Sequence, residues 1–245
     1  IIIIGESALE LKSGKYIYEE LKKFLIKNNS INENWNGLNI LAQNASTVGL
    51  LDLKILHGKN NKLSFFFDNL KNRKFKLLYL LGSDNLDFQK NDEFIVYQGS
   101  HGDRGAEIAD LILPSATYTE QNGLYENLEG RIQECKKASY PIGEALEDWK
   151  IFNRITKKLG SKEKIANFDE LRKEVLETIS NFSEINDLPK KSVIKSNNVE
   201  TSFFSEKIFV RELDYYYTNS ISRSSKTMSE CRQIRLKNKK NGTNN

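Results

Sequence analysis

Three short apolar runs, each followed by residues that turn the chain, most constrain how this 245-residue sequence can fold. The runs are Phe75–Leu81, Phe94–Tyr97 and Ala109–Leu113. Near-continuous apolar runs of this length are typical of central strands in a parallel sheet, which is buried on both faces. Gly82-Ser83-Asp84 and Gln98-Gly99-Ser100 close the first two runs. Pro114 marks the exit of the third, because proline cannot donate to a strand ladder.

Apolar residues at helical spacing alternate with these strands. Ile17, Leu21, Phe24 and Leu25 predict a helix over residues 15–27, between short strands at Ile1–Ile4 and Leu38–Leu41. A looser helical pattern covers Ala45–Leu56. Two later helices are predicted: one is capped by Asp148 and ended by Gly160, and the other is capped by Asp169. The sequence therefore predicts an α/β fold with a doubly wound, mainly parallel sheet, whose ligands lie at the carboxyl ends of the strands.

The pattern divides the chain into three parts. Residues 1–145 are expected to form the α/β domain, residues 146–181 a helical extension packed on it, and residues 182–245 an irregular, extended C-terminal interface segment with a basic tail. Residues 115–141 have little periodicity and are interpreted as an ordered loop with a hairpin. Residues 182–210 are weakly patterned, and the segment from Glu230 onward is expected to be a solvated tail.

Composition excludes several function classes. The net charge of +4 is modest for this length and does not call for a nucleic-acid partner. No stretch reaches the roughly 20 apolar residues of a membrane helix. Cys135 and Cys231 lie far apart without a Cys/His cluster, so neither an iron-sulfur centre nor a zinc site is expected, and free thiols suit a reducing compartment. The apolar start without Met is expected of the interior of a larger protein.

The glycine turns after the strands have two interpretations. The backbone amides of Gly82, Gly99, Gly102 and Gly105 are suited to cradle phosphates of a nucleotide. None of these turns completes a known phosphate-binding motif, so an ordinary structural turn is the favoured alternative. His57 and His101 have no partner nearby in the sequence and are expected to be structural or exposed.

The densest pattern of polar residues follows the third run. It begins with Ala109-Asp110-Leu111-Ile112-Leu113-Pro114 and continues with Glu120, Gly123, Tyr125, Asn127, Glu129, Gly130, Arg131 and Gln133. We call residues 109–133 the cofactor-type block, because it resembles a block shared by molybdopterin oxidoreductases. In active members of that family, this region lies at the pterin-nucleotide cofactor. Its side chains suit such a ligand, since Asp, Asn and Glu accept from amino groups and Arg pairs with phosphate.

A second resemblance extends over nearly the whole chain. It rests on three stretches: F-K-L-L-Y-L-L-G-S-D with F-I-V-Y-Q-G-S-H-G-D (75–84 and 94–103), E-D-W-K-I (147–151), and the terminal signature N-S-I-S-R-S-S-K-T-M (219–228). Together they resemble the C-terminal, molybdopterin-oxidoreductase-like part of the large iron-sulfur (75-kDa) subunit of mitochondrial respiratory complex I.

That resemblance implies a structural and assembly role in NADH:ubiquinone oxidoreductase, at the matrix side of the mitochondrial inner membrane. No catalytic residue, no metal ligand, no molybdenum and no bound cofactor are expected here, so the cofactor-type block would be a degenerate form of the family's block. The iron-sulfur clusters would lie on a preceding part or a separate chain. The expected partners are other peripheral-arm subunits, including the cluster-bearing half of the same subunit. The candidate interface residues are Tyr217, Ser220, Ile221, Arg223 and Met228. A terminal segment packed on its own chain is the alternative for these residues.

Two other functions remain open from the sequence. One is a cofactor-binding fragment of a true molybdopterin oxidoreductase. The other is a free-standing nucleotide-binding module that uses the turns at Gly82 and Gly99.

Overall fold

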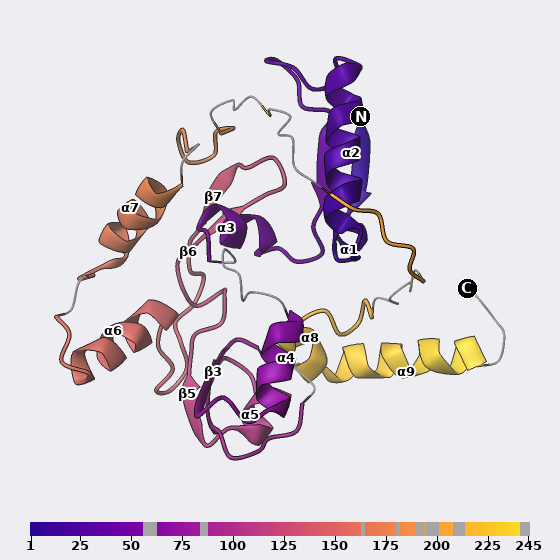
Figure 1. The fold of residues 1–245 in the computed structure, drawn as a ribbon. Coiled ribbons are helices and arrows are strands. Elements are labelled where there is room, and N and C mark those ends of the chain that lie inside the picture. Colours follow the sequence, from indigo (N-terminus) through magenta and orange to yellow (C-terminus); the bar gives the residue numbers. More distant parts are fainter. Residues whose placement is uncertain are drawn as a thin grey trace. The chain divides into compact units, whose positions relative to one another are not determined.

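The chain folds into two compact units, each built from segments that are separated in the sequence (Figure 1). The computed structural model describes residues 1–55, 63–83, 88–162, 165–179, 182–189, 194, 201–207 and 214–240. Unit 1 comprises Ile1–Lys59, Asn122–Lys136 and Ile165–Phe209, and unit 2 comprises Asn60–Gln121, Lys137–Lys164 and Val210–Asn245. The domain boundaries expected at residues 145 and 181 stay a prediction.

A two-stranded parallel sheet under a long helix forms the core of unit 1. Strand β1 (Ile2–Gly5) pairs with β2 (Leu38–Leu41), and the helices α1 (Glu6–Leu9) and α2 (Gly14–Lys27) follow β1. Ile4, Leu25, Ile31 and Leu38 are buried together, because one face of each strand meets the apolar stripe of α2. The two strands and the helix predicted for this segment are confirmed.

The rest of unit 1 contains a short helix, a hairpin and a longer helix. Helix α3 (Thr47–Asp52) occupies only part of the predicted range 45–56. Strands β6 (Gly123–Glu126) and β7 (Ile132–Cys135) are antiparallel and confirm the expected hairpin. Helix α7 (Phe168–Thr178) is capped by Asn167, whose side chain accepts from the Glu170 amide, so the predicted cap at Asp169 is wrong.

Unit 2 holds the three predicted central strands in one parallel sheet. Strands β3 (Leu77–Leu81), β4 (Phe94–Gly99) and β5 (Leu111–Pro114) lie in the order β3-β4-β5. Helices α4 (Leu63–Lys71) and α5 (Arg104–Ile108) accompany them. One face of the sheet forms a core with Leu70 of α4; its buried members are Leu70, Leu78, Leu80, Phe88, Ile95 and Tyr97. The parallel α/β class predicted from the apolar runs is confirmed.

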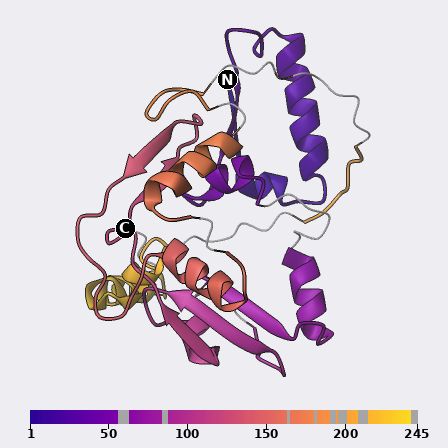
Figure 2. The same ribbon diagram turned by 90° about the vertical axis from the view of Figure 1, so that its left-hand side faces the viewer.

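Helix α6 (Asp148–Lys158) packs on the opposite face of this sheet (Figure 2). The ring of Phe152 stacks on that of Tyr79 at 5.6 Å, and Ile151 is buried. The helix ends as predicted at Gly160, which has a positive φ of 84° and so favours glycine. Its N-cap is Glu147 and not Asp148, which is the first residue of the helix.

The described C-terminal part is more regular than expected. Helices α8 (Ser220–Ser224) and α9 (Lys226–Lys240) occupy residues predicted to be irregular or a solvated tail. Asn219 begins α8 with a capping box, in which its side chain accepts from the Ser222 amide and the Ser222 side chain contacts the Asn219 amide. Among the described helices, none is long and apolar enough to cross a membrane.

Candidate functional site

The first polar residue of the cofactor-type block, Asp110, fastens β5 to its neighbour in unit 2. Its Oδ1 atom accepts from Lys90 Nζ at 2.5 Å, and its Oδ2 atom accepts from the Ile95 amide of β4 at 2.8 Å. The hydrogen bond from Lys90, and after it the one from Ile95, lower the pKa of Asp110. Both carboxylate oxygens are therefore engaged within the chain.

Pro114 and Glu120 shape the chain as it leaves β5. The Pro114 carbonyl accepts from the Leu146 amide at 3.3 Å. Glu120 closes a turn on itself: its Oε2 atom accepts from the Thr117 amide at 3.2 Å, and its own amide donates to the Thr117 carbonyl at 2.9 Å. These two residues thus have structural contacts that account for their positions.

The second half of the block lies in unit 1 and forms the turn between β6 and β7. Asn127 Oδ1 accepts from the amides of Glu129 at 2.9 Å and Arg131 at 3.0 Å. Gly130 has a φ of 77°, and a Cβ there would lie 2.9 Å from Pro189 Cγ, so glycine is needed for both reasons. Gly123 pairs with Cys135 at the other end of the hairpin.

The charged side chains of this turn pair within unit 1. Arg131 lies 3.7 Å from Glu129 and donates through Nη1 to the Asn186 carbonyl. Asn186 in turn donates its amide to the Ile132 carbonyl at 2.8 Å. Arg131 therefore ties residues 182–189 to the hairpin.

These contacts test whether the block fits a pterin cofactor. Asp110, Glu120, Asn127 and Arg131 all use their side chains in hydrogen bonds or ion pairs to other residues of the chain. Within the described residues, no group of three or more His, Cys, Asp or Glu side chains is placed to hold a metal ion. The polar side chains of the block that could contact a pterin are thus engaged as caps and links within each unit.

The glycines after β4 are explained by one buried aromatic ring. Tyr97 is 2% exposed and donates its hydroxyl to the His101 carbonyl at 2.9 Å. A Cβ on Gly99 would lie 2.2 Å from the Tyr97 hydroxyl, and one on Gly105 would lie 2.9 Å from the Tyr97 ring. The ring thus explains why glycine stands at both positions, and this favours the structural interpretation of these turns over phosphate binding.

His101 and Gly82 make local contacts in the loops that follow β4 and β3. His101 Nδ1 lies 3.0 Å from Ser100 Oγ on the surface of unit 2. Gly82 has a φ of 61° and donates its amide to the Gln98 carbonyl at 2.8 Å. His57 and Asp84 lie outside the described residues.

A buried polar network that the sequence analysis did not single out joins β3, β4 and α6 in unit 2. Gln98 is fully buried, accepts from the Tyr79 hydroxyl, and donates through Nε2 to Asp148 Oδ1 at 2.6 Å. Gln121 Nε2 donates to Asp148 Oδ2 at 3.2 Å. Burial, and secondly the Asp148 carboxylate, raise the pKa of Tyr79. Asp148 therefore provides the acceptor for the buried side-chain amide of Gln98 and for the partly buried one of Gln121.

The carboxylate of the neighbouring Glu147 is also paired within the chain. It is 5% exposed, accepts from Trp149 Nε1 at 2.8 Å and pairs with Lys150 at 3.1 Å and Lys137 at 3.6 Å. Burial alone would raise the pKa of Glu147, but the hydrogen bonds from Trp149 and Lys150 hold it below its usual value. The E-D-W-K motif is thus explained by packing and hydrogen bonding inside unit 2.

The terminal signature is tied to the loop after β4 by an ion pair. Arg223 Nε donates to Asp103 Oδ2, and the two side chains are only 14% and 29% exposed. Asp103 also caps α5 by accepting from the Arg104 amide at 2.8 Å. Burial alone would raise the pKa of Asp103, but the hydrogen bonds from Arg223 and Arg104 lower it. Two motifs that lie 120 residues apart in the sequence therefore meet in one contact.

The other candidate interface residues make contacts within the C-terminal segment itself. The Tyr217 ring lies under the Arg232 guanidinium at 4.6 Å, and Arg232 also pairs with Asp214. Ser220 accepts from Ser224 Oγ at 2.9 Å through its carbonyl, and Met228 donates its amide to Ser225 Oγ at 3.3 Å. Ile221 is 37% exposed. These contacts are the ones expected of a segment packed on its own chain, and the interface role stays a prediction.

One perturbed carboxyl group lies directly before Asn127. Glu126, the last residue of β6, is 8% exposed. Burial first, then the Asp52 carboxylate at the end of α3 and a hydrogen bond with it, raise the pKa of Glu126 to about 7. Glu126 is therefore a buried carboxyl group whose protonation depends on pH in the neutral range.

Comparison of the sequence with known protein families gives two matches. The profile of the family described as "Molybdopterin oxidoreductase" matches residues 1–158, and the chain belongs to that family. A second profile, which describes the C-terminal part of the G-type subunit of NADH-ubiquinone oxidoreductase, matches residues 183–231. This second range includes the whole terminal signature.

The curated relatives narrow the resemblance within the family. The chain is 40% identical over 238 residues to the NADH-ubiquinone oxidoreductase 75 kDa subunit of Reclinomonas americana, covering 96% of the chain and 34% of the relative. It is 38% identical over 232 residues to the G-type subunit of the NADH-quinone oxidoreductase of Rickettsia bellii, covering 94% of the chain and 32% of that relative.

A fungal relative is similar to the chain to about the same degree and over about the same share of its length. The NADH-ubiquinone oxidoreductase 78 kDa mitochondrial subunit of Candida albicans is 37% identical over 251 residues, with 94% of the chain and 32% of the relative covered. The chain thus spans about a third of the length of these relatives. The expected resemblance to the large subunit of complex I is confirmed.

Proposed function

We propose that this chain is a non-catalytic structural part of the large subunit of NADH:ubiquinone oxidoreductase, which supports electron transfer without carrying it. The observation that carries the proposal is the contact between Arg223 of the terminal signature and Asp103 of the Y-Q-G-x-H-G-D motif. This contact, together with the internal hydrogen bonds of Asp148 and Glu147, supports a packing role for these motifs in unit 2. The relatives themselves are named as subunits of NADH oxidoreductases.

We further propose that the chain binds neither molybdenum nor a pterin, and that the iron-sulfur clusters lie on another part of the subunit or on a separate chain. The proposal is supported by the internal hydrogen bonds of Asp110, Glu120, Asn127 and Arg131, which occupy the groups that a cofactor would need. A cofactor would have to break these bonds and would leave polar groups unpaired, which opposes binding.

The location proposed for the chain is the peripheral arm of complex I at the matrix side of the mitochondrial inner membrane. Its partners would be other peripheral-arm subunits, including the cluster-bearing half of the same subunit. Support comes from the mitochondrial relatives and from the finding that none of the described helices could span a membrane.

The test is native gel electrophoresis of respiratory membranes that contain a tagged form of the chain. The tag should co-migrate with NADH dehydrogenase activity, and the excised band should contain iron but no molybdenum above background. Migration of the chain alone would contradict the proposal. Migration with a molybdenum-containing band would favour the alternative of a molybdopterin oxidoreductase fragment.

A further inference from the structure

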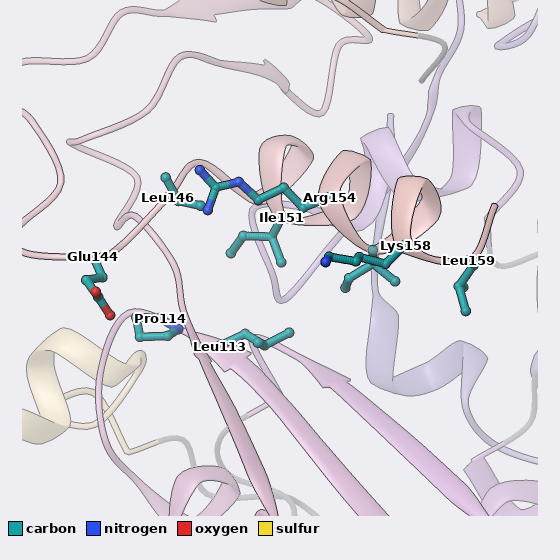
Figure 3. A pocket seen from close by; sticks show the side chains of 9 residues that line it. Leu113, Pro114, Glu144, Leu146, Ile151, Arg154, Lys158 and Leu159 are labelled. Atoms are coloured by element: carbon teal, nitrogen blue, oxygen red, sulfur yellow. The ribbon is translucent and has the colours of Figure 1, made fainter. Parts of the chain in front are cut away.

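A cavity of about 650 Å³ lies in unit 2 between α6 and the end of β5 (Figure 3). Its lining is mostly apolar and consists of Leu113, Pro114, Glu144, Leu146, Ile151, Arg154, Ile155, Lys158 and Leu159. Leu113 and Pro114 form one side at the carboxyl end of the strand, and α6 forms the other. The carboxyl ends of parallel strands are where α/β proteins usually bind ligands.

Two cations border this apolar space. Arg154 and Lys158 lie one turn apart on α6, and neither makes an ion pair or hydrogen bond with any residue in the described part of the chain. Lys158 belongs to the last turn, where a cation interacts favourably with the helix dipole. Arg154 lies a full turn earlier, where the interaction with the helix dipole is weak. The dipole therefore does not explain why a cation stands at this position.

The size of the cavity indicates that it binds a small ligand and not a protein partner. Small-molecule sites are clefts of about 300–1,000 Å³ with apolar walls and a few polar groups. A stable protein interface instead uses about 20–30 residues on each side. The nine lining residues and the volume of about 650 Å³ match the first class.

We infer that this cavity binds a small anionic amphiphile, a carboxylate on an unbranched apolar chain, with its head group between Arg154 and Lys158. The chain would lie against Leu113, Leu146 and Ile155, and the carboxylate would receive charge-assisted hydrogen bonds from the two cations. Glu144, on the facing loop, would repel a second negative charge and so favours a single anionic head group.

The test uses the full chain and three probes: dodecanoate, dodecan-1-ol and acetate. Isothermal titration should show saturable one-to-one binding of dodecanoate. Dodecan-1-ol, which lacks the charge, should bind at least about tenfold more weakly, and acetate, which lacks the chain, should not bind measurably. Equal binding of the alcohol, or no saturable binding of dodecanoate, would overturn the inference.

Substitutions at the cavity test whether dodecanoate binds there. Combined replacement of Arg154→Gln and Lys158→Gln should weaken dodecanoate at least about tenfold, whereas the adjacent Lys157→Gln, which does not line the cavity, should leave the affinity unchanged. Leu159→Asp is a second variant that preserves folding, because this side chain is 78% exposed. Its negative charge at the cavity should also weaken binding. An unchanged affinity in both cavity variants would show that dodecanoate binds elsewhere.

Discussion

The turn at Asn127–Arg131 in unit 1 and the polar contacts of β4 in unit 2 use hydrogen bonds over very different ranges. Asn127 bonds to the amides of residues two and four positions ahead, so it shapes one turn. In unit 2, Gln98 bonds to Asp148 across 50 residues, and Asp103 bonds to Arg223 across 120. The turn therefore specifies local geometry, whereas the contacts of β4 and its loop join three separate segments of the chain. Removing one of these long-range contacts should consequently cost more stability than removing a contact in the turn.

The largest effect is expected at Asp148. Replacement by Leu leaves the buried Gln98 amide without its acceptor, which should lower the free energy of unfolding by about 3 kcal/mol. Asp92→Ala is the matched control, because Asp92 pairs with Arg73 on the surface and is 81% exposed. Urea unfolding followed by circular dichroism would measure both. Equal midpoints for the two variants would show that the network contributes nothing.

Glu126 combines both kinds of contact. It directly precedes the turn, but it interacts with Asp52, which is distant in the sequence. Its pKa is raised from 4.5 to about 7, so the folded state holds a proton that the unfolded chain releases. The stability contributed by this group is fully present below pH 4.5 and is lost as the pH rises to about 7. Glu126→Gln should remove this dependence and should stabilise the protein at pH 8 by about 2 kcal/mol.

Unfolding midpoints at several values between pH 4.5 and 8 would test this account, with Glu129→Gln as the control on the exposed side of the same turn. The control should follow the original protein at every pH. If the midpoint of Glu126→Gln changed with pH as that of the original protein does, Glu126 would not be the source of the pH dependence.

The smallest effect is expected at Asn127. Replacement by Ala removes the acceptor of two backbone amides and should cost about 1 kcal/mol. Asp at this position keeps an oxygen acceptor and should be nearly neutral. The urea midpoints of the two variants give the difference, and a loss at Asn127→Ala larger than that at Asp148→Leu would reverse the comparison.

The strands could be predicted from the sequence because their apolar runs are short, nearly continuous and closed by turn residues. The predicted Leu38–Leu41 strand matches the structure, and Ile1–Ile4 is shifted by one residue to Ile2–Gly5. Helices without a clear apolar stripe are harder to predict from the sequence. Residues 226–240 form α9, although their charges are nearly all of one sign and conceal the helical period.

The roles of the site residues could be predicted only in part. The residue types of the cofactor-type block suit a ligand, although the resemblance predicts that none is bound. In the structure, the side chains of Asn127 and Glu120 cap nearby amides. Residue types do not show which acceptors the backbone will use. The partners of Asp148 and Arg223 depend on how distant segments pack, and no local pattern in the sequence indicates such pairs.

The pair of Arg223 and Asp103 tests most directly whether the terminal signature serves the chain's own structure. A double-mutant cycle of Arg223→Ala, Asp103→Ala and the combined variant, measured by urea unfolding of the full chain, isolates their interaction. The account predicts a coupling free energy of about 2 kcal/mol, since both side chains are largely buried. Strictly additive losses would contradict it and would mean that the signature is kept for a partner outside the chain.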